Sequence, residues 1–131
     1  MSDGDTAAKA QGGRILYLDD EEPLVFLVTR LLRRLGFEPV GFTDTAQALR
    51  AFKSNPGQFV LVLTDLSMPG SNGLDFAREV LATAPDTRVA ILSGHINPAD
   101  VTRAAAIGIR AVEQKPLTLE ELGPVVRRLL M

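Results

Sequence analysis

Hydrophobic residues follow two alternating patterns along this 131-residue chain. Short runs of aliphatic and β-branched residues, typical of buried strands, alternate with longer segments in which apolar residues recur at helical spacing. The short runs lie at residues 15–18, 40–42, 59–63, 88–92 and 111–112. The sequence therefore predicts five strands, each followed by a helix.

The predicted helices have recognisable start and stop residues. The first carries an apolar stripe from Leu24 to Leu35, with Pro23 in its first turn and Gly36 at its C-terminal cap. The others are expected at residues 45–54, 73–84, 97–108 and 118–131. Because a helix separates each pair of consecutive strands, the strands can run parallel, with right-handed crossovers that place helices on both faces of one sheet.

The fourth and fifth helices have less regular patterns. In the fourth, we expect Val101, Ala104 and Ala105 to face the core. In the fifth, Gly123 and Pro124 interrupt the pattern, because proline lacks the amide hydrogen that an internal helical bond needs. We expect either a kink there or a true helix start near Pro124.

Composition excludes several classes of protein. The chain has no cysteine and one histidine, which excludes disulfide scaffolds, thiol catalysis and multi-histidine zinc sites. Its net charge of −2 argues against direct binding of nucleic acid or of an anionic membrane. No apolar run approaches the ~20 residues that span a bilayer.

Residues 1–13 differ from the rest of the chain. They are small and polar, without apolar periodicity, and we expect a flexible leader or linker there. They contain no hydrophobic region of a secretory signal, so a cytoplasmic location is expected. Residues 14–131 are long enough for one domain with its own hydrophobic core.

Polar residues suited to chemistry follow four of the predicted strands. Asp19 and Asp20 follow the first strand, and Asp65 follows the third. Ser93 and Lys115 follow the fourth and the fifth. Ligands of open parallel sheets bind at the carboxyl ends of the strands, so we expect these side chains to share one edge. Taken singly, each could be an ordinary turn, cap or surface residue.

The acidic residues predict a cation site. Asp19, Asp20 and Asp65 would repel one another unless a cation lay among them or their pKa values rose. Mg²⁺ suits oxygen ligands, and a carboxylate beside Mg²⁺ can attack phosphorus to form an acyl phosphate. We interpret Glu21 and Glu22 as solvated residues at a helix N-terminus.

The segments LYLDDEE, LVLTDLSMPGSNG, ILSG and EQKP, in this order, resemble the receiver (response regulator) domain of two-component phosphorelays, in the CheY-like superfamily. The resemblance extends from about Arg14 to Met131. It implies a flavodoxin-like (βα)5 sandwich with strand order 2-1-3-4-5. It also implies a phosphoacceptor switch rather than an enzyme, limited to self-catalysed phosphorylation from phosphodonors and slow autodephosphorylation.

The resemblance assigns a role to each acidic residue. It implies that Asp65 accepts the phosphoryl group. Mg²⁺ would bind Asp20, Asp65 and the backbone carbonyl of Ser67 directly. Asp19 would act on Mg²⁺ mostly through water.

The resemblance also implies how a signal is received and passed on. Ser93 would swing its hydroxyl toward the phosphoryl group, and Lys115 would pair with it. The face formed by the fourth helix, fifth strand and fifth helix would then change. The implied donor is a histidine kinase or histidine phosphotransfer protein, and the reader is a downstream effector or a tethered output domain. A homodimer through the same face is allowed, and the receiver could stand alone or belong to a hybrid kinase or longer regulator.

Three positions are not settled by the family pattern. Val112 stands where family members often carry an aromatic residue that reports phosphorylation, so aliphatic repacking is the alternative. Gly94 stands where alanine is common, which predicts a looser loop. His95 is either an exposed loop residue or one that tunes access of water to the acyl phosphate.

Three other functions compete with this interpretation. A phosphohydrolase similar to haloacid dehalogenases would need a second aspartate two residues after its nucleophile, where Ser67 stands. A flavin-binding module would need a hydroxyl- and glycine-rich loop after the first strand, where four acids stand. A pseudo-receiver would only bind partners, and a measured Mg²⁺ affinity separates it from a working receiver.

Overall fold

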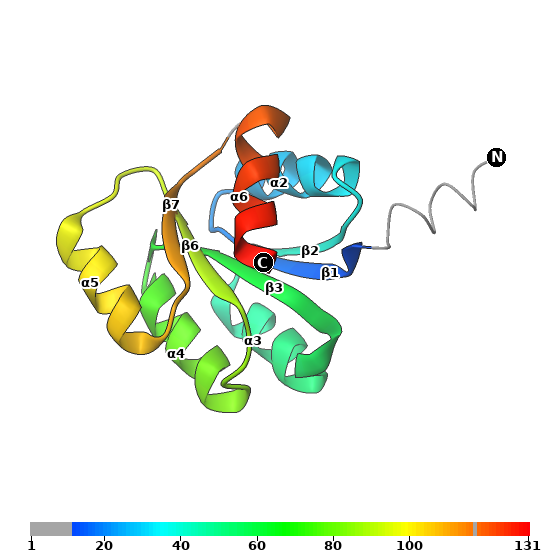
Figure 1. Ribbon diagram of the computed structural model, residues 1–131. Coiled ribbons are helices and arrows are strands. Elements are labelled where there is room, and N and C mark those ends of the chain that lie inside the picture. The colour runs from blue at the N-terminus through cyan, green and yellow to red at the C-terminus, as the bar shows by residue number, and fades with distance from the viewer. Residues whose placement is uncertain (1–11, 117) are drawn as a thin grey trace.

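Five parallel strands form the sheet of the computed structural model, which describes residues 12–116 and 118–131. They are β1 (Arg14–Leu18), β2 (Glu38–Phe42), β3 (Phe59–Asp65), β6 (Val89–Ser93) and β7 (Ala111–Gln114). Their order is β2-β1-β3-β6-β7, and every pairing is parallel (Figure 1). Since β6 and β7 are the fourth and fifth strands of this sheet along the chain, the predicted order 2-1-3-4-5 is confirmed.

Five α-helices occur in the described part of the chain. They are α2 (Glu22–Arg34), α3 (Thr45–Ser54), α4 (Gly73–Thr83), α5 (Pro98–Ile107) and α6 (Leu119–Leu130). Among these helices, none combines the length and apolarity that crossing a bilayer requires. The predicted leader, residues 1–13, lies outside the described residues except for its last two glycines.

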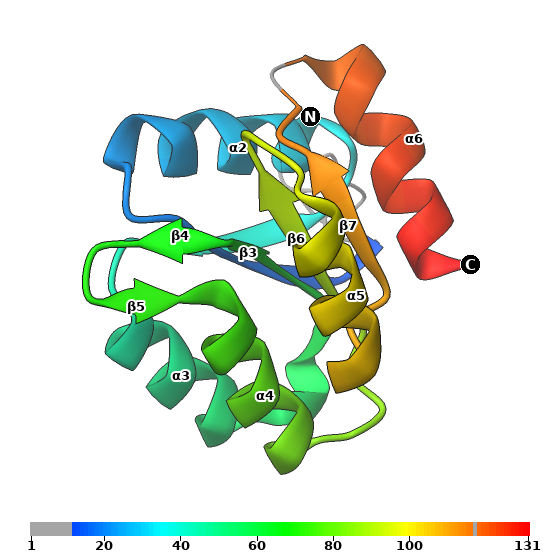
Figure 2. The ribbon, with the colours of Figure 1, turned by 90° about the vertical axis from the view of Figure 1, so that its left-hand side faces the viewer.

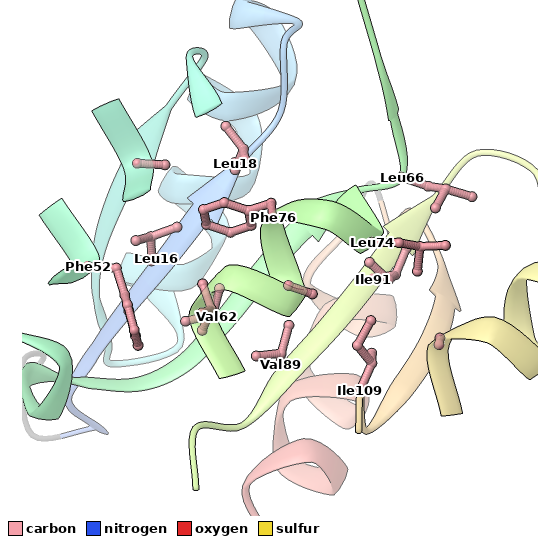
Figure 3. Close-up of a cluster of buried hydrophobic side chains, with 14 of the residues drawn as sticks. Leu16, Leu18, Phe52, Val62, Leu66, Leu74, Phe76, Val89, Ile91 and Ile109 are labelled. Carbon is pink, nitrogen blue, oxygen red and sulfur yellow. The ribbon is translucent and has the colours of Figure 1, made fainter. Parts of the chain in front are cut away.

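The helices cover both faces of the sheet (Figures 1 and 2). One hydrophobic cluster joins the sheet to α2 and α6, and a second joins it to α3, α4 and α5. Alternate residues of one strand serve the two clusters, as the pleat requires: Tyr17 of β1 belongs to the first, and Leu16 and Leu18 to the second. Figure 3 shows the second cluster, where Phe52 and Phe76 pack toward these leucines. The doubly covered sheet explains why the strands are apolar on both sides.

Polar residues cap the N-termini of four of the helices, and each capping side chain accepts a hydrogen bond from a backbone amide of the first turn. They are Asp44, Asn72, Asn97 and Thr118. Thr118 caps the start of α6 five residues before Gly123, so the predicted start at residue 118 is confirmed and the alternative start near Pro124 is wrong. Pro124 is tolerated because it lies on the exposed side of α6, where solvent can replace one helical bond.

Helix α5 is oriented differently from the prediction. Ala104 is buried as expected, but Ala105 is exposed and Val101 is 43% exposed. The inward side of α5 instead carries Ala104 with the partly buried Asp100 and Ile107. Residues 100, 104 and 107 also lie on one face of a helix. Because α5 carries small alanines on several sides, the sequence pattern does not show clearly which face is buried.

A short antiparallel hairpin follows β3 and was not predicted. It consists of β4 (Ser67–Met68) and β5 (Ser71–Asn72), joined through Gly70 with φ 68° (Figure 2). The hydroxyl of Ser71 lies 2.8 Å from that of Thr45, which links the hairpin to the start of α3. Two-residue strands are too short to produce a period in the sequence.

Candidate functional site

The carboxyl ends of β1, β3, β6 and β7 meet at one edge of the sheet, and the predicted polar residues lie there. Asp65 ends β3 and is paired in register with Leu92, the residue before Ser93. Ser93 ends β6, and its carbonyl accepts a hydrogen bond from the amide of Lys115 at 2.8 Å. Asp19 directly follows β1, and its amide bonds to the end of β2. Parallel topology alone brings these residues together from four strands.

Three carboxylates form the centre of the site. Asp19, Asp20 and Asp65 each offer an oxygen, and these oxygens lie within 4.8 Å of one another. Asp19 is fully buried and Asp65 is 6% exposed. Asp20 is half-buried and lines a surface cavity of about 420 Å³ between the start of α3 and the β4–β5 hairpin. The cluster is therefore closed on the Asp19 side and open on the Asp20 side.

Lys115 reaches into this cluster from the end of β7. Its Nζ atom lies 2.9 Å from Oδ2 of Asp19 and 3.3 Å from Oδ1 of Asp65. Its side chain is only 15% exposed. One ammonium group thus offsets part of the repulsion between two buried carboxylates.

Further hydrogen bonds orient the two buried acids. The hydroxyl of Tyr17 donates to Oδ2 of Asp19 at 2.8 Å, and the amide of Glu21 donates to Oδ1 at 2.9 Å. The amide of Leu66 donates to Oδ1 of Asp65 at 2.8 Å. The sequence interpretation missed Tyr17. The signal that could have found it is its position two residues before Asp19, because alternate residues of a strand share a face.

Burial and charge shift the pKa values of the site in definite directions. Burial, together with the charge of Asp19, raises the pKa of Asp65 and outweighs the lowering by Lys115. Burial alone would lower the pKa of Lys115, but its hydrogen bond to Asp19 and the charges of Asp19 and Asp65 raise it overall. Burial and the charge of Asp19 also raise the pKa of Tyr17. At neutral pH, Lys115 is therefore charged and the phenol keeps its proton to donate.

The loop after β6 holds its own polar groups together. The Ser93 hydroxyl donates to the carbonyl of His95 at 2.7 Å, and the His95 amide lies 3.2 Å from the same hydroxyl. The side-chain amide of Gln114 donates to the carbonyl of Gly94 at 2.7 Å. The Ser93 hydroxyl is thus engaged within its loop, His95 is exposed, and Val112 is partly buried against the second cluster.

Gly73 allows the start of α4 to approach Asp65 closely. A Cβ atom at position 73 would lie 2.1 Å from the backbone oxygen of Asp65, and the Gly73 amide donates to the carbonyl of Leu66 at 2.7 Å. Ser67, which opens the hairpin between these segments, has an exposed side chain. The backbone of Asp65 and Leu66 is therefore packed closely against the start of α4.

The donor set suits a hard divalent cation. Every side-chain ligand available in the cluster is a carboxylate oxygen, which favours Mg²⁺ or Ca²⁺ over softer metals. The exposed side at Asp20 leaves room for the waters that Mg²⁺ retains. The residues present therefore fit a magnesium site.

A comparison with protein families matches most of the chain. The family model described as the response regulator receiver domain matches residues 15–127. Among curated proteins, the chain is similar to the DNA-binding transcriptional regulator NtrC of Azospirillum brasilense, with 35% identity over 116 residues. That match covers 88% of this chain and 24% of NtrC, so the chain spans about a quarter of that relative.

Solved structures of similar fold include two with 29% identity. A response regulator receiver domain protein from Clostridium thermocellum has a TM-score of 0.82, covering 90% of this chain and 94% of that one. The response regulator TrrA from Thermotoga maritima, solved in complex with Mg²⁺ and BeF, has a TM-score of 0.79, covering 90% of this chain and 99% of that one. The similarity thus extends over nearly the whole described sheet and its helices.

Proposed function

Since the chain belongs to the response regulator receiver domain family, the phosphoacceptor switches of two-component signalling, we propose that Asp65 is its phosphoacceptor. The donor is a phosphohistidine on a histidine kinase or a histidine phosphotransfer protein. The position of Lys115 carries the proposal, because its ammonium lies 2.9 Å from Asp19 and 3.3 Å from Asp65. A fixed cation at this place stabilises the negative charge that phosphoryl transfer concentrates there.

The oxygen Oδ2 of Asp65 is the nucleophile in this proposal. Oδ1 accepts a hydrogen bond from the Leu66 amide and pairs with Lys115, whereas Oδ2 forms no hydrogen bond or ion pair among the described residues. Oδ2 attacks phosphorus while the bond from phosphorus to the donor imidazole nitrogen breaks. The electron pair of that bond returns to the imidazole, leaving an aspartyl phosphate on this chain and a free histidine on the donor.

The same acids would hold Mg²⁺. The proposed ligands are Asp20, Asp65 and the backbone carbonyl of Ser67, with Asp19 acting through water. When bound, Mg²⁺ neutralises charge between the carboxylate and the phosphoryl oxygens. Asp19 is held in place for this by three donors, and half-buried Asp20 leaves the cluster accessible.

Phosphorylation would change the partners of Ser93 and Lys115. The phosphoryl group adds nearly two negative charges, so the ammonium of Lys115 gains a stronger acceptor than Asp65 alone. To reach the same group, the Ser93 hydroxyl must release the carbonyl of His95. The loop after β6 then rearranges, and the surface of α5, β7 and α6 changes with it.

That surface is the proposed reader site. Its partner is a downstream effector or a tethered output domain, and a homodimer through α5, β7 and α6 would use the same residues. We place the receiver domain at residues 14–131 and a leader or linker at residues 1–13, in a cytoplasmic protein. We assign the receiver domain itself no contact with nucleic acid or membrane.

Autodephosphorylation should be slow. An efficient phosphohydrolase of this general fold would need a second acid close after its nucleophile, and Ser67 occupies that position. The exposed His95 lies beside Ser93, where it can influence access of water to the acyl phosphate. We therefore propose a switch with slow self-hydrolysis rather than a turnover enzyme.

Phosphotransfer from a phosphorylated histidine kinase tests the proposal. The chain is incubated with the kinase and Mg²⁺, and the acid-stable and base-labile label of an acyl phosphate is measured. Wild type and Asp75→Asn, an exposed acid of α4 paired with Arg78, should be labelled. Asp65→Asn and a sample with chelator should not be labelled. Equal labelling of Asp65→Asn would contradict the assignment.

A further inference from the structure

Tyr17 is the one tyrosine of this chain, and its hydroxyl is placed inside the acidic site. The residue is fully buried in the hydrophobic cluster between the sheet and helices α2 and α6. A buried phenol needs a hydrogen-bond partner, and this one donates to Oδ2 of Asp19 at 2.8 Å. The motif of acids, serine and lysine that identifies the site does not include this residue.

Tyr17 is one of three groups that fix the carboxylate of Asp19. Oδ2 accepts from the Tyr17 hydroxyl and from Nζ of Lys115, while Oδ1 accepts from the Glu21 amide. A carboxylate has about four acceptor positions, so little freedom remains to this buried group. One position remains, and an oxygen of Asp19 lies within 4.8 Å of oxygens of Asp20 and Asp65.

Lys115 is a shared partner, whereas Tyr17 is not. The same ammonium lies 3.3 Å from Asp65 and, under the proposed function, pairs with the phosphoryl group. Oδ2 of Asp19 would then keep only the Tyr17 hydroxyl as a side-chain donor. An acceptor left without a donor in a fully buried position is unfavourable, so this hydroxyl matters most when Lys115 moves.

We infer that Tyr17 is a positioning residue of the cation site, which acts through its hydroxyl by holding the carboxylate of Asp19 toward Asp20 and Asp65. The inference rests on the proposed function only for the identity of the cation, Mg²⁺. The ring contributes to the core, and the hydroxyl contributes to the site. Tyr17→Phe separates the two roles because it removes the hydroxyl and keeps the ring.

Calorimetric titration with Mg²⁺ alone tests the inference. Tyr17→Phe should weaken Mg²⁺ binding about tenfold, the low end of the usual effect of losing an outer hydrogen-bond partner of a metal site. The matched control is Thr29→Val, which also removes a buried hydroxyl, one that bonds to carbonyls of α2 away from the acids. This control should bind Mg²⁺ as wild type does. Equal affinity of Tyr17→Phe and wild type would overturn the inference.

A double-mutant cycle separates action through Asp19 from a general structural effect. In an Asp19→Asn background, Tyr17→Phe should weaken Mg²⁺ binding by much less than in wild type, because the group that Tyr17 positions is changed. The same tenfold loss in both backgrounds would overturn the inference. Circular dichroism of all four proteins checks that they fold alike.

A spectroscopic readout covers the case in which Asp19→Asn binds too weakly to titrate. Since the chain has one tyrosine, 3-fluorotyrosine labelling should give a single ¹⁹F resonance. That resonance should shift as Mg²⁺ is added, and the midpoint of the shift should agree with the Kd that calorimetry gives. A resonance that stays fixed while calorimetry shows binding would overturn the inference. Neither calorimetry nor ¹⁹F NMR needs phosphorylation. A failure to label Asp65 in the phosphotransfer test would therefore refute the proposed function without deciding the role of Tyr17, which these two measurements test.

Discussion

Asp65 carries its charge in surroundings that disfavour it. The residue is 6% exposed and lies in one cluster with Asp19 and Asp20. Lys115 lies 3.3 Å away, yet burial and the charge of Asp19 still raise the pKa of Asp65 above its ordinary value. A divalent cation in the cluster would favour the ionised form, so cation binding and the charge of Asp65 are coupled.

Asp65→Asn should stabilise the folded chain when a chelator removes divalent cations. Because the pKa of Asp65 is higher in the folded than in the unfolded chain, stability falls as pH rises through the interval between the two pKa values. At neutral pH the neutral side chain should therefore raise the melting temperature by a few degrees. Calorimetry measures this, with the exposed change Asp75→Asn as control. A melting temperature below wild type would contradict it.

Lys115→Met should raise the pKa of Asp65 further. Lys115 lowers that pKa, so its removal leaves burial and the charge of Asp19 to act without it. NMR titration of ¹³C-labelled aspartate with chelator present should give a wild-type midpoint for Asp65 above the ordinary value of an aspartate side chain, and a higher one in the variant. Lys53→Met, which breaks the exposed pair with Glu79, serves as control. If Lys115→Met titrates like wild type, the ion pair with Asp65 does not form.

Sequence alone could predict which residues meet, but not how they bond. Asp19, Asp65 and Lys115 each follow a strand, and parallel topology then brings them to one edge. The position of Tyr17 two residues before Asp19 indicates that the two share a face of the strand. The hydrogen bond between them depends in addition on a side-chain rotamer and on the packing of α2 and α6, which the sequence does not show. The turn of Ser93 toward the carbonyl of His95 is likewise set by local loop geometry.

At the level of elements, regular leucine spacing predicts orientation better than alanine does. The stripe of α2 predicts its buried face, where Val28, Leu31 and Leu32 pack on the sheet. Helix α5 has three alanines in succession, at positions 104–106, and its buried face differs from the prediction. The sequence therefore predicts that the helix exists, but its small alanines do not show which of its faces is buried.

Gly73→Ala should disrupt the junction between β3 and α4. A Cβ atom there would lie 2.1 Å from the backbone oxygen of Asp65, so the backbone of Asp65 must move. Overpacking of this kind should lower the free energy of unfolding by about 3 kcal/mol. Urea denaturation measures this loss. Gly57→Ala, where a Cβ atom meets nothing within 4 Å, is the control and should change stability little. Equal stability of both variants would mean that the start of α4 is not in close steric contact with the backbone of Asp65.

Across the whole molecule, the site joins elements that are distant in sequence. Asp19 directly follows β1 and Asp65 ends β3. Ser93 ends β6, and its carbonyl accepts a backbone hydrogen bond of 2.8 Å from Lys115, which directly follows β7. A change at the acids can therefore reach α5, β7 and α6 through two neighbouring strands. Hydrophobic clusters pack both faces of the sheet, so we expect the sheet to stay rigid if this edge changes on phosphorylation.

Mg²⁺ should raise the thermal stability of the whole chain. The unfolded chain does not bring the three acids together, so Mg²⁺ binds the folded state preferentially. At a free concentration one hundred times the Kd, the gain in stability should be about 2.7 kcal/mol. Thermal unfolding with Mg²⁺ and with a monovalent salt of equal ionic strength measures it. Asp20→Asn should lose most of the gain, and a wild-type chain that Mg²⁺ fails to stabilise would refute the cation site.

The most direct measurement is to locate the phosphoryl group on the chain. After phosphotransfer in Mg²⁺, borohydride reduction converts an aspartyl phosphate to homoserine, and peptide mass spectrometry finds the altered residue. We predict that the change occurs at Asp65 and at no other acid. Homoserine at Asp19 or Asp20, or a phosphorylated chain with Asp65 unaltered, would contradict the assignment.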